Sequence, residues 1–149
     1  MTAPYFTLLH EGGFATGATR YSDTFGHRSC INVSVSIAGM TISAILDTGA
    51  EWCIIDPELL ELVDLEPVRQ ITYTTRFGDI SGTLNRANII VQAEYGEALA
   101  LETTIFKADV EDGDVWRLPN FLGWSNCLDR IRFAIDPDPT HPTFYFGSL

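Results

Sequence analysis

The stretch Asp47-Thr48-Gly49-Ala50 holds the residues of this chain that are best suited to chemistry. Apolar runs precede it at 42–46 and follow it at 53–55, so a carboxylate lies on a tight turn between two strands that we expect to be buried. An ordinary surface turn does not explain this context. The alternative, that Asp47 only caps its own backbone as Asp often does in turns, stays open.

Two carboxylates held about 3 Å apart cannot both ionise, so such a pair shares one proton and divides into an acid and a base. The base can take a proton from water while the acid hydrogen-bonds a carbonyl oxygen, which is the chemistry of peptide hydrolysis without a metal. Thr48 can hydrogen-bond across to a second loop, and Gly49 leaves room for its N–H to approach the carboxylate. The sequence has a single Asp-Thr/Ser-Gly triplet. The pair therefore requires a second copy of the chain, with Asp47 facing its equivalent on a two-fold axis.

The elements that must position this turn are short strands. Period-two alternation, apolar runs and turn residues predict strands over 31–37, 41–46, 53–55, 71–75, 82–86, 88–93, 98–106, 131–135 and 143–146. The run 41–46 is nearly all apolar, which predicts a strand covered on both faces. Asp56-Pro57-Glu58 is typical of a helix start, and residues 124–130 are expected to form a second short helix. The pattern predicts a mostly β domain with a closed or folded-over sheet.

The length of 149 residues predicts one domain. Residues 1–28 are rich in Gly, Thr and Ser, and we expect them to form an arm or a loose edge segment in front of a domain over 29–149. The net charge is −11 and the nine basic residues are scattered singly. Nucleic acids and anionic membrane surfaces are therefore not expected as partners. The acidic excess favours basic or neutral peptides.

Three widely spaced cysteines suggest neither a disulfide framework nor a metal site, so we expect no metal and no cofactor. Cys53 is expected to pack as a small apolar residue rather than to act as a nucleophile. The sequence shows no signal-peptide pattern and no apolar run of the ~20 residues that a membrane span needs. A cytoplasmic location is expected.

Three landmarks within residues 31–146 resemble the retropepsin-like aspartic proteases of the single-domain, dimeric type. The first, Ile45-Leu46-Asp47-Thr48-Gly49-Ala50, is similar to the catalytic loop of that family. The second, Phe77-Gly78-Asp79-Ile80-Ser81-Gly82, is similar to its flap, although these residues could also form an ordinary hairpin tip. The third, Phe121-Leu122-Gly123, is similar to its element of two hydrophobic residues and Gly, which lies beside the catalytic loop.

The resemblance implies a retropepsin-like closed β-barrel or folded sheet with two short helices. It assigns Asp47 as the catalytic residue, Thr48, Gly49 and Ala50 as the active-site loop, Phe77, Gly78, Asp79 and Ile80 as a substrate-binding flap, and Leu122 and Gly123 as the supporting element. Phe77 stands where pepsin-like relatives have Tyr, which the dimeric retropepsins also lack. The sequence departs from the family at Asp79, which puts a charge where retropepsins favour Gly and apolar residues.

The function implied is that of an aspartic endopeptidase, a homodimer that acts on peptide or protein substrates. Two alternatives stay open. The chain could be a non-catalytic dimerisation or peptide-binding module with the same fold, or residues 1–28 could block the cleft until they are removed.

Overall fold

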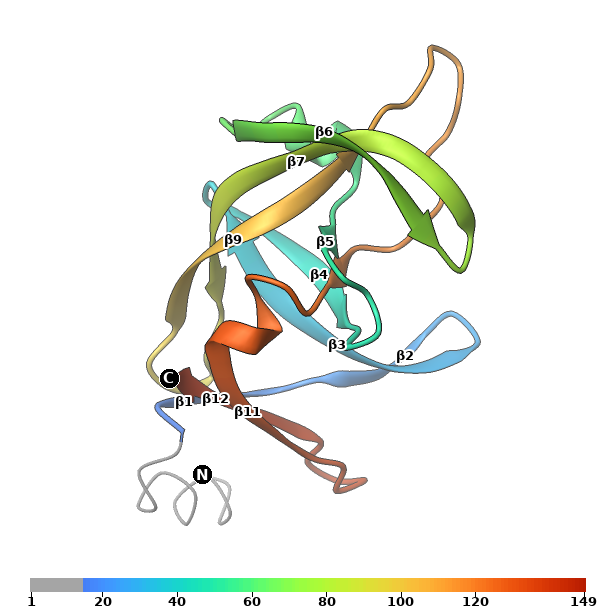
Figure 1. Ribbon diagram of the computed structural model, residues 1–149. Helices are drawn as coiled ribbons and strands as arrows, with labels where there is room; N and C mark the ends of the chain where they lie inside the picture. The colour runs from blue at the N-terminus through green and yellow to red at the C-terminus, as the bar shows by residue number, and fades with distance from the viewer. Residues whose placement is uncertain (1–14) are drawn as a thin grey trace.

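The computed structural model describes residues 15–149, most of which lie in strands (Figure 1). Its larger sheet has the strand order β2-β3-β4-β10-β5-β9-β7-β6, and β3 also pairs with β7. These strands are β2 (Ser22–Phe25), β3 (Arg28–Ile37), β4 (Met40–Leu46), β5 (Cys53–Ile54), β6 (Glu66–Thr75), β7 (Gly78–Val91), β9 (Leu99–Ala108) and β10 (Phe121–Leu122). Because β3 pairs with both β4 and β7, the strands from β3 to β7 close into a barrel. The closed, mostly β architecture expected from the sequence is confirmed.

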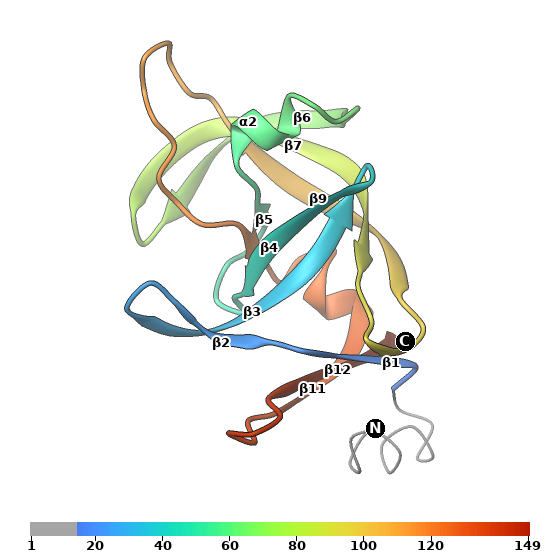
Figure 2. The same ribbon diagram turned by 180° about the vertical axis from the view of Figure 1, so that it is seen from behind.

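The smaller sheet has the order β11-β12-β1-β8 and is antiparallel throughout. Its strands are β1 (Gly17–Arg20), β8 (Tyr95–Gly96), β11 (Ile131–Asp136) and β12 (Thr143–Ser148). It lies below the barrel in Figures 1 and 2. One hydrophobic cluster joins the two sheets, since Phe144 and Phe146 of β12 pack with Val33, Val35 and other buried residues of the barrel.

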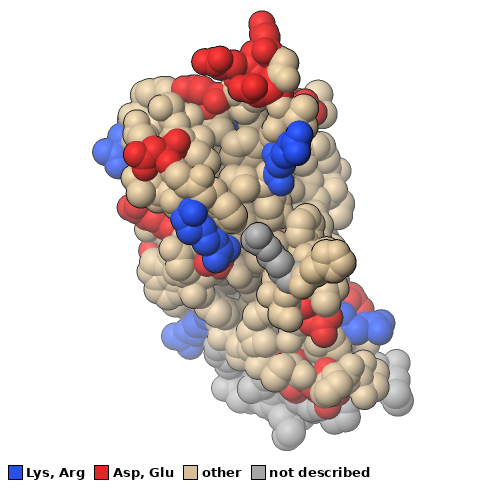
Figure 3. Space-filling view, turned by 90° about the vertical axis from the view of Figure 1, so that its right-hand side faces the viewer, with Lys and Arg blue, Asp and Glu red and all other residues tan. Residues whose placement is uncertain are grey.

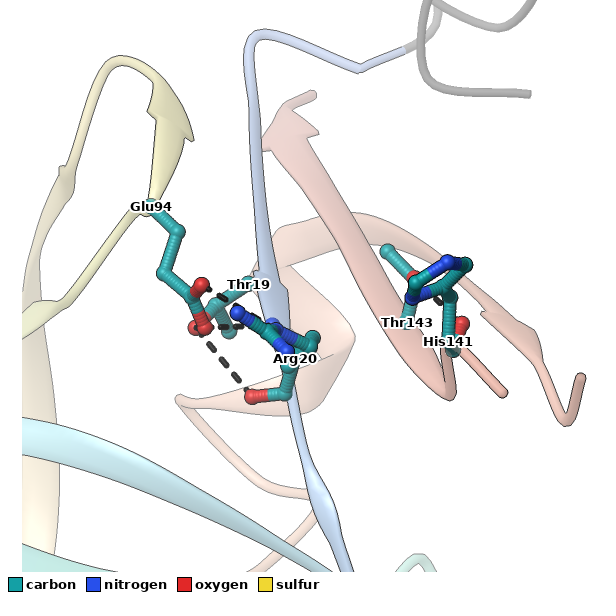
Figure 4. Close-up of polar contacts among 5 residues, drawn as sticks. All are labelled: Thr19, Arg20, Glu94, His141 and Thr143. Carbon is teal, nitrogen blue, oxygen red and sulfur yellow. Dashed lines mark hydrogen bonds and ion pairs between the residues drawn. The ribbon is translucent and has the colours of Figure 1, made fainter. Parts of the chain in front are cut away.

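Strands β1 and β2 fall within the segment that we expected to be an arm, of which residues 1–14 lie outside the described residues. Ala18 of β1 is fully buried, and its carbonyl oxygen accepts the Glu94 N–H at 2.9 Å. The Glu94 carboxylate accepts hydrogen bonds from the Arg20 N–H at 3.0 Å and the Thr19 hydroxyl at 3.3 Å (Figure 4). On the other side of β1 runs β12, which begins at Thr143. Residues 17–25 are thus built into both sheets, and the boundary at 28/29 stays a prediction.

Two local predictions were wrong. Strand β4 is not covered along both faces: Ile42 and Ala44 are buried, but Thr41 and Ser43 are exposed, and on that second face it is Ile45 that packs against a hydrophobic cluster. The segment 124–130 is a turn followed by the three-residue 3₁₀ helix η1 (Leu128–Arg130). Asn126 has φ 57°, a left-handed conformation through which an α-helix cannot continue.

The predicted helix start at Asp56 is confirmed. Helix α2 (Pro57–Leu60) begins after Asp56, whose carboxylate accepts the Glu58 N–H at 2.9 Å. Within residues 15–149 no helix has the length and hydrophobicity needed to cross a bilayer.

Candidate functional site

Asp47 lies at the carboxyl end of β4, where three strands meet. Strand β10 pairs in parallel with β4 and antiparallel with β5, so it separates the strands on either side of the Asp47 loop. The backbone N–H of Asp47 donates to the carbonyl oxygen of Leu122 at 2.9 Å. The position of Asp47 is therefore set by a strand that lies more than seventy residues later in the chain.

Gly123, directly after β10, holds the returning half of the loop. A Cβ at Gly123 would overlap the carbonyl group of Trp52 and lie 2.9 Å from the carbonyl oxygen of Ala50. The next backbone N–H, that of Trp124, donates to the same Ala50 oxygen at 2.8 Å. The backbone N–H of Ser125 donates to the carbonyl oxygen of Glu51 at 2.8 Å. The absence of a side chain at Gly123 is what lets these backbones pack together.

The loop itself is a tight turn around the Asp47 side chain. Oδ1 of Asp47 accepts the Gly49 N–H at 3.0 Å, and the Asp47 carbonyl oxygen accepts the Ala50 N–H at 3.1 Å. A Cβ at Gly49 would lie 3.2 Å from Oδ1, so glycine leaves the carboxylate undisturbed. The Asp47 side chain keeps 24% of its surface exposed, and Thr48 and Gly49 are exposed beside it. The structure thus brings the predicted loop residues together around one partly exposed carboxylate.

A cleft of about 350 Å³ opens in front of this carboxylate. The loop forms one wall, Ile54 and Phe121 contribute apolar surface from the barrel, and the turn of the β6–β7 hairpin closes the far side. The lining residues are Asp47, Gly49, Ala50, Glu51, Ile54, Tyr73, Thr74, Thr75, Arg76, Phe77 and Phe121. A hairpin over a carboxylate-bearing cleft can hold an extended chain between them.

The hairpin turn is tighter than expected. Its ladder runs to the pair Thr75–Gly78, so the turn consists of Arg76 and Phe77 rather than residues 76–81. Gly78 has φ +112°, which side-chain-bearing residues rarely adopt. Of the predicted flap residues, Phe77 lines the cleft, with its ring 6.5 Å from that of Phe121. Gly78, Asp79 and Ile80 lie on β7, opposite residues of β6.

Sequence reasoning missed Arg76 and Tyr73. A terminal nitrogen of Arg76 lies 3.4 Å from Oδ2 of Asp47, and the guanidinium stands 5.3 Å from the centre of the Phe77 ring. Tyr73 is buried and its hydroxyl oxygen accepts the Trp52 N–H at 3.3 Å, which ties β6 to the loop. A basic residue within the predicted tip was a visible signal for Arg76. No sequence signal pointed to Tyr73, because its contact with the Trp52 backbone N–H arises only when the barrel closes.

Two of the three cysteines, Cys53 and Cys127, are buried next to the site. Cys53 is fully buried, and its sulfur accepts the Gly123 N–H at 3.4 Å, so its predicted packing role is confirmed. A hydrogen bond with Cys53, together with burial, raises the pKa of the Cys127 thiol far above its usual range. No group of three or more His, Cys, Asp or Glu is placed to hold a metal ion among the residues that the structure describes.

A scan against protein-family models finds no match, and a search of curated proteins finds none either. Solved structures do match. A retropepsin-like aspartic protease from Rickettsia conorii aligns with TM-score 0.54 and 20% identity over 89% of this chain and 94% of that one. The EIAV protease in complex with the inhibitor HBY-793 aligns with TM-score 0.45 and 16% identity over 67% and 86%. The Simian foamy virus protease aligns with TM-score 0.42 and 19% identity over 64% and 89%. The match to the Rickettsia structure shows that the chain has the retropepsin-like fold.

Proposed function

We propose that the protein is an aspartic endopeptidase that works as a homodimer and forms its catalytic pair from the Asp47 carboxylates of two copies. One observation carries the proposal: hydrogen bonds to the Leu122 carbonyl oxygen and from the Gly49 N–H hold Asp47 at the mouth of a cleft of about 350 Å³, beneath a β-hairpin. The retropepsin-like fold supports the same class of reaction.

In the proposed reaction the two carboxylates share one proton. The ionised Asp47 takes a proton from a water molecule, whose oxygen attacks the scissile carbonyl carbon, while the neutral Asp47 protonates the carbonyl oxygen. The tetrahedral intermediate then collapses: the C–N bond breaks, the amine nitrogen takes a proton from the pair, and a hydroxyl group of the intermediate gives its proton back to the pair as the new carbonyl forms. The pair ends with the single proton with which it began.

The surface around Asp47 is suited to a second copy. Thr48 and Gly49 are exposed at the tip of the loop, and Trp124, which is hydrogen-bonded to the loop through Ala50, has 45% of its surface exposed. A two-fold axis through this face would place each Thr48 hydroxyl within reach of the other loop and cover apolar surface that one chain leaves open. A single copy cannot complete the pair, since the sequence has one Asp-Thr-Gly turn.

The peptide would lie extended between the loop and the hairpin and add to it as a further strand through backbone hydrogen bonds. Ile54, Phe77 and Phe121 would then provide apolar surface for its side chains. Under this arrangement the residues of the hairpin turn contact the substrate directly.

The substitution Asp47→Asn tests the proposal. The Asn Oδ1 can still accept the Gly49 N–H, and the ion pair that is lost is a single 3.4 Å contact with the 66% exposed Arg76 side chain, which contributes about 0–1 kcal/mol. The variant should therefore fold with nearly unchanged stability but lose cleavage of an unfolded protein substrate by at least about 10²-fold. Cleavage that persists in folded Asp47→Asn protein would rule out the mechanism.

The contact between Arg76 and Asp47 favours a second candidate function, a non-catalytic peptide-binding or dimerisation module. In a single chain this cation stands where a catalytic pair needs a second carboxylate. Sedimentation equilibrium discriminates between the two. A monomer at assay concentration without Asp47-dependent cleavage supports the module, whereas a dimer that binds a pepstatin-type inhibitor supports the protease.

A further inference from the structure

We infer that the protein selects peptides with an acidic side chain beside a large apolar one, and that this acidic side chain binds Arg76 and displaces it from Asp47. The inference rests on the proposed peptidase function and names its substrate class. Three features support it: a second cavity under the hairpin turn, its charge, and the weak contact that Arg76 makes in the free chain.

The second cavity, of about 470 Å³, adjoins the Asp47 cleft. The two share Arg76, Phe77 and Phe121, so they meet beneath the hairpin turn. The other walls come from the β2–β3 turn at residues 25–27 and from the segment 117–119. Figure 3 looks onto the side of the molecule from which the β6–β7 and β2–β3 turns project. A peptide that passes under the hairpin would reach both cavities.

The charge of this second cavity is opposite to that of the whole chain. Arg76 and Arg117 line it, and no described lining residue is a carboxylate, although the chain has 20 acidic and nine basic residues. In Figure 3 the acidic side chains gather most densely at the top of this face, away from its middle, where basic side chains stand. Among residues 15–149 no carboxylate lies within salt-bridge distance of Arg117. Arg117 therefore gives the cavity a positive charge that no described carboxylate neutralises.

Apolar surface surrounds these cations. Phe25 and Phe77 are 45% and 42% exposed, and further apolar surface comes from Ile45, Leu118, Pro119 and Phe121. An acidic side chain next to a large apolar one matches both kinds of surface. The net charge of −11 favours basic peptides at long range, but salt screens that field beyond about 10 Å, and the groups beside the bound peptide decide selectivity.

The contact between Arg76 and Asp47 is easily exchanged. It is one nitrogen–oxygen approach of 3.4 Å, and the Arg76 side chain is 66% exposed. A carboxylate on a bound peptide can take two parallel hydrogen bonds from the same guanidinium, which is a stronger arrangement. The exchange also serves the proposed chemistry, because the Arg76 guanidinium lies 3.4 Å from Oδ2 of the carboxylate that the second Asp47 has to meet. Substrate binding at Arg76 would thus release the catalytic pair.

Matched peptides test the inference. Cleavage sites are first mapped by mass spectrometry on a library of peptides from a digested proteome, and peptides that differ only by Glu or Gln near the scissile bond are then compared. The wild-type enzyme should cleave the Glu peptide with a kcat/KM about tenfold higher. Arg76→Gln should bring this ratio to about one. The control is Arg86→Gln, which removes an exposed cation of β7 that pairs with Glu66 of β6. This variant should keep the tenfold ratio.

Binding to the Asp47→Asn protein separates this inference from the proposed function. The variant lacks the carboxylate that competes for Arg76, so a fluorescent Glu peptide should bind the variant more tightly than the wild type. On the variant, the Glu peptide should also bind about tenfold more tightly than the matched Gln peptide. An absence of Asp47-dependent cleavage of any library peptide overturns the peptidase proposal alone. Equal binding of the two peptides, or a Glu preference that survives Arg76→Gln, overturns the role of Arg76.

Discussion

Gly123 couples the packing of the barrel to the position of Asp47, and Gly123→Ala tests that coupling. The added Cβ would overlap the Trp52 carbonyl group and lie 2.9 Å from the Ala50 oxygen. Both are backbone atoms, and the Ala50 oxygen is held by the Trp124 N–H at 2.8 Å. No side-chain rotation can relieve the contact, so the loop itself must shift.

The expected cost follows from these contacts. Overpacking a well-packed site costs typically about 1–3 kcal/mol, and contact with backbone places Gly123→Ala at the upper end. The lower entropy of the unfolded alanine chain offsets about 0.4–1 kcal/mol of this. The remaining destabilisation of roughly 2–2.6 kcal/mol lowers the Tm of a chain of this size by roughly 4–10 °C. A displacement of the carboxylate approaching 1 Å lowers kcat/KM by about 10²-fold.

Gly17→Ala is the matched control. Its Cβ would overlap the Glu97 carbonyl oxygen and lie 2.6 Å from the Phe146 ring, in the smaller sheet and away from the cleft. Both variants should lose a similar amount of stability in thermal denaturation followed by circular dichroism. Only Gly123→Ala should lose peptide cleavage when both are assayed well below their Tm.

Two results would refute this reasoning. An unchanged Tm for Gly123→Ala would mean that the loop and the segment after β10 do not approach as closely as the structure has them. An equal loss of kcat/KM in Gly17→Ala would mean that activity follows overall stability rather than the position of Asp47.

Three further predictions concern the terminus, the buried hydroxyl and the pH profile. Removal of residues 1–28 deletes β1 and should abolish cooperative unfolding; a well-folded, more active chain starting at Ser29 would instead support a blocking segment. Tyr73→Phe removes the acceptor of the Trp52 N–H and should cost about 1 kcal/mol, or a Tm loss of about 2–4 °C, which calorimetry can measure. Peptide cleavage should decline as pH rises, because the pair loses its shared proton, and a flat rate up to about pH 9 would contradict a carboxylate pair.

The sequence by itself determined the features that depend on neighbouring residues. Alternation of apolar and polar residues set the strands β3 and β11, and Asp56-Pro57 set the start of α2. The turn at Asp47 was visible because short-range hydrogen bonds of Asp, Gly and Ala define it. Such patterns are local, since side-chain spacing and capping act within a few residues.

Only the tertiary structure decided what meets the carboxylate. Leu122 fixes the Asp47 N–H, and Arg76 reaches the Asp47 carboxylate from a hairpin 29 residues away in the sequence. These contacts depend on barrel closure through the pairing of β3 with β7 and on β10 lying between β4 and β5. Long-range pairing of this kind reflects burial summed over the whole core, which no short stretch of residues encodes.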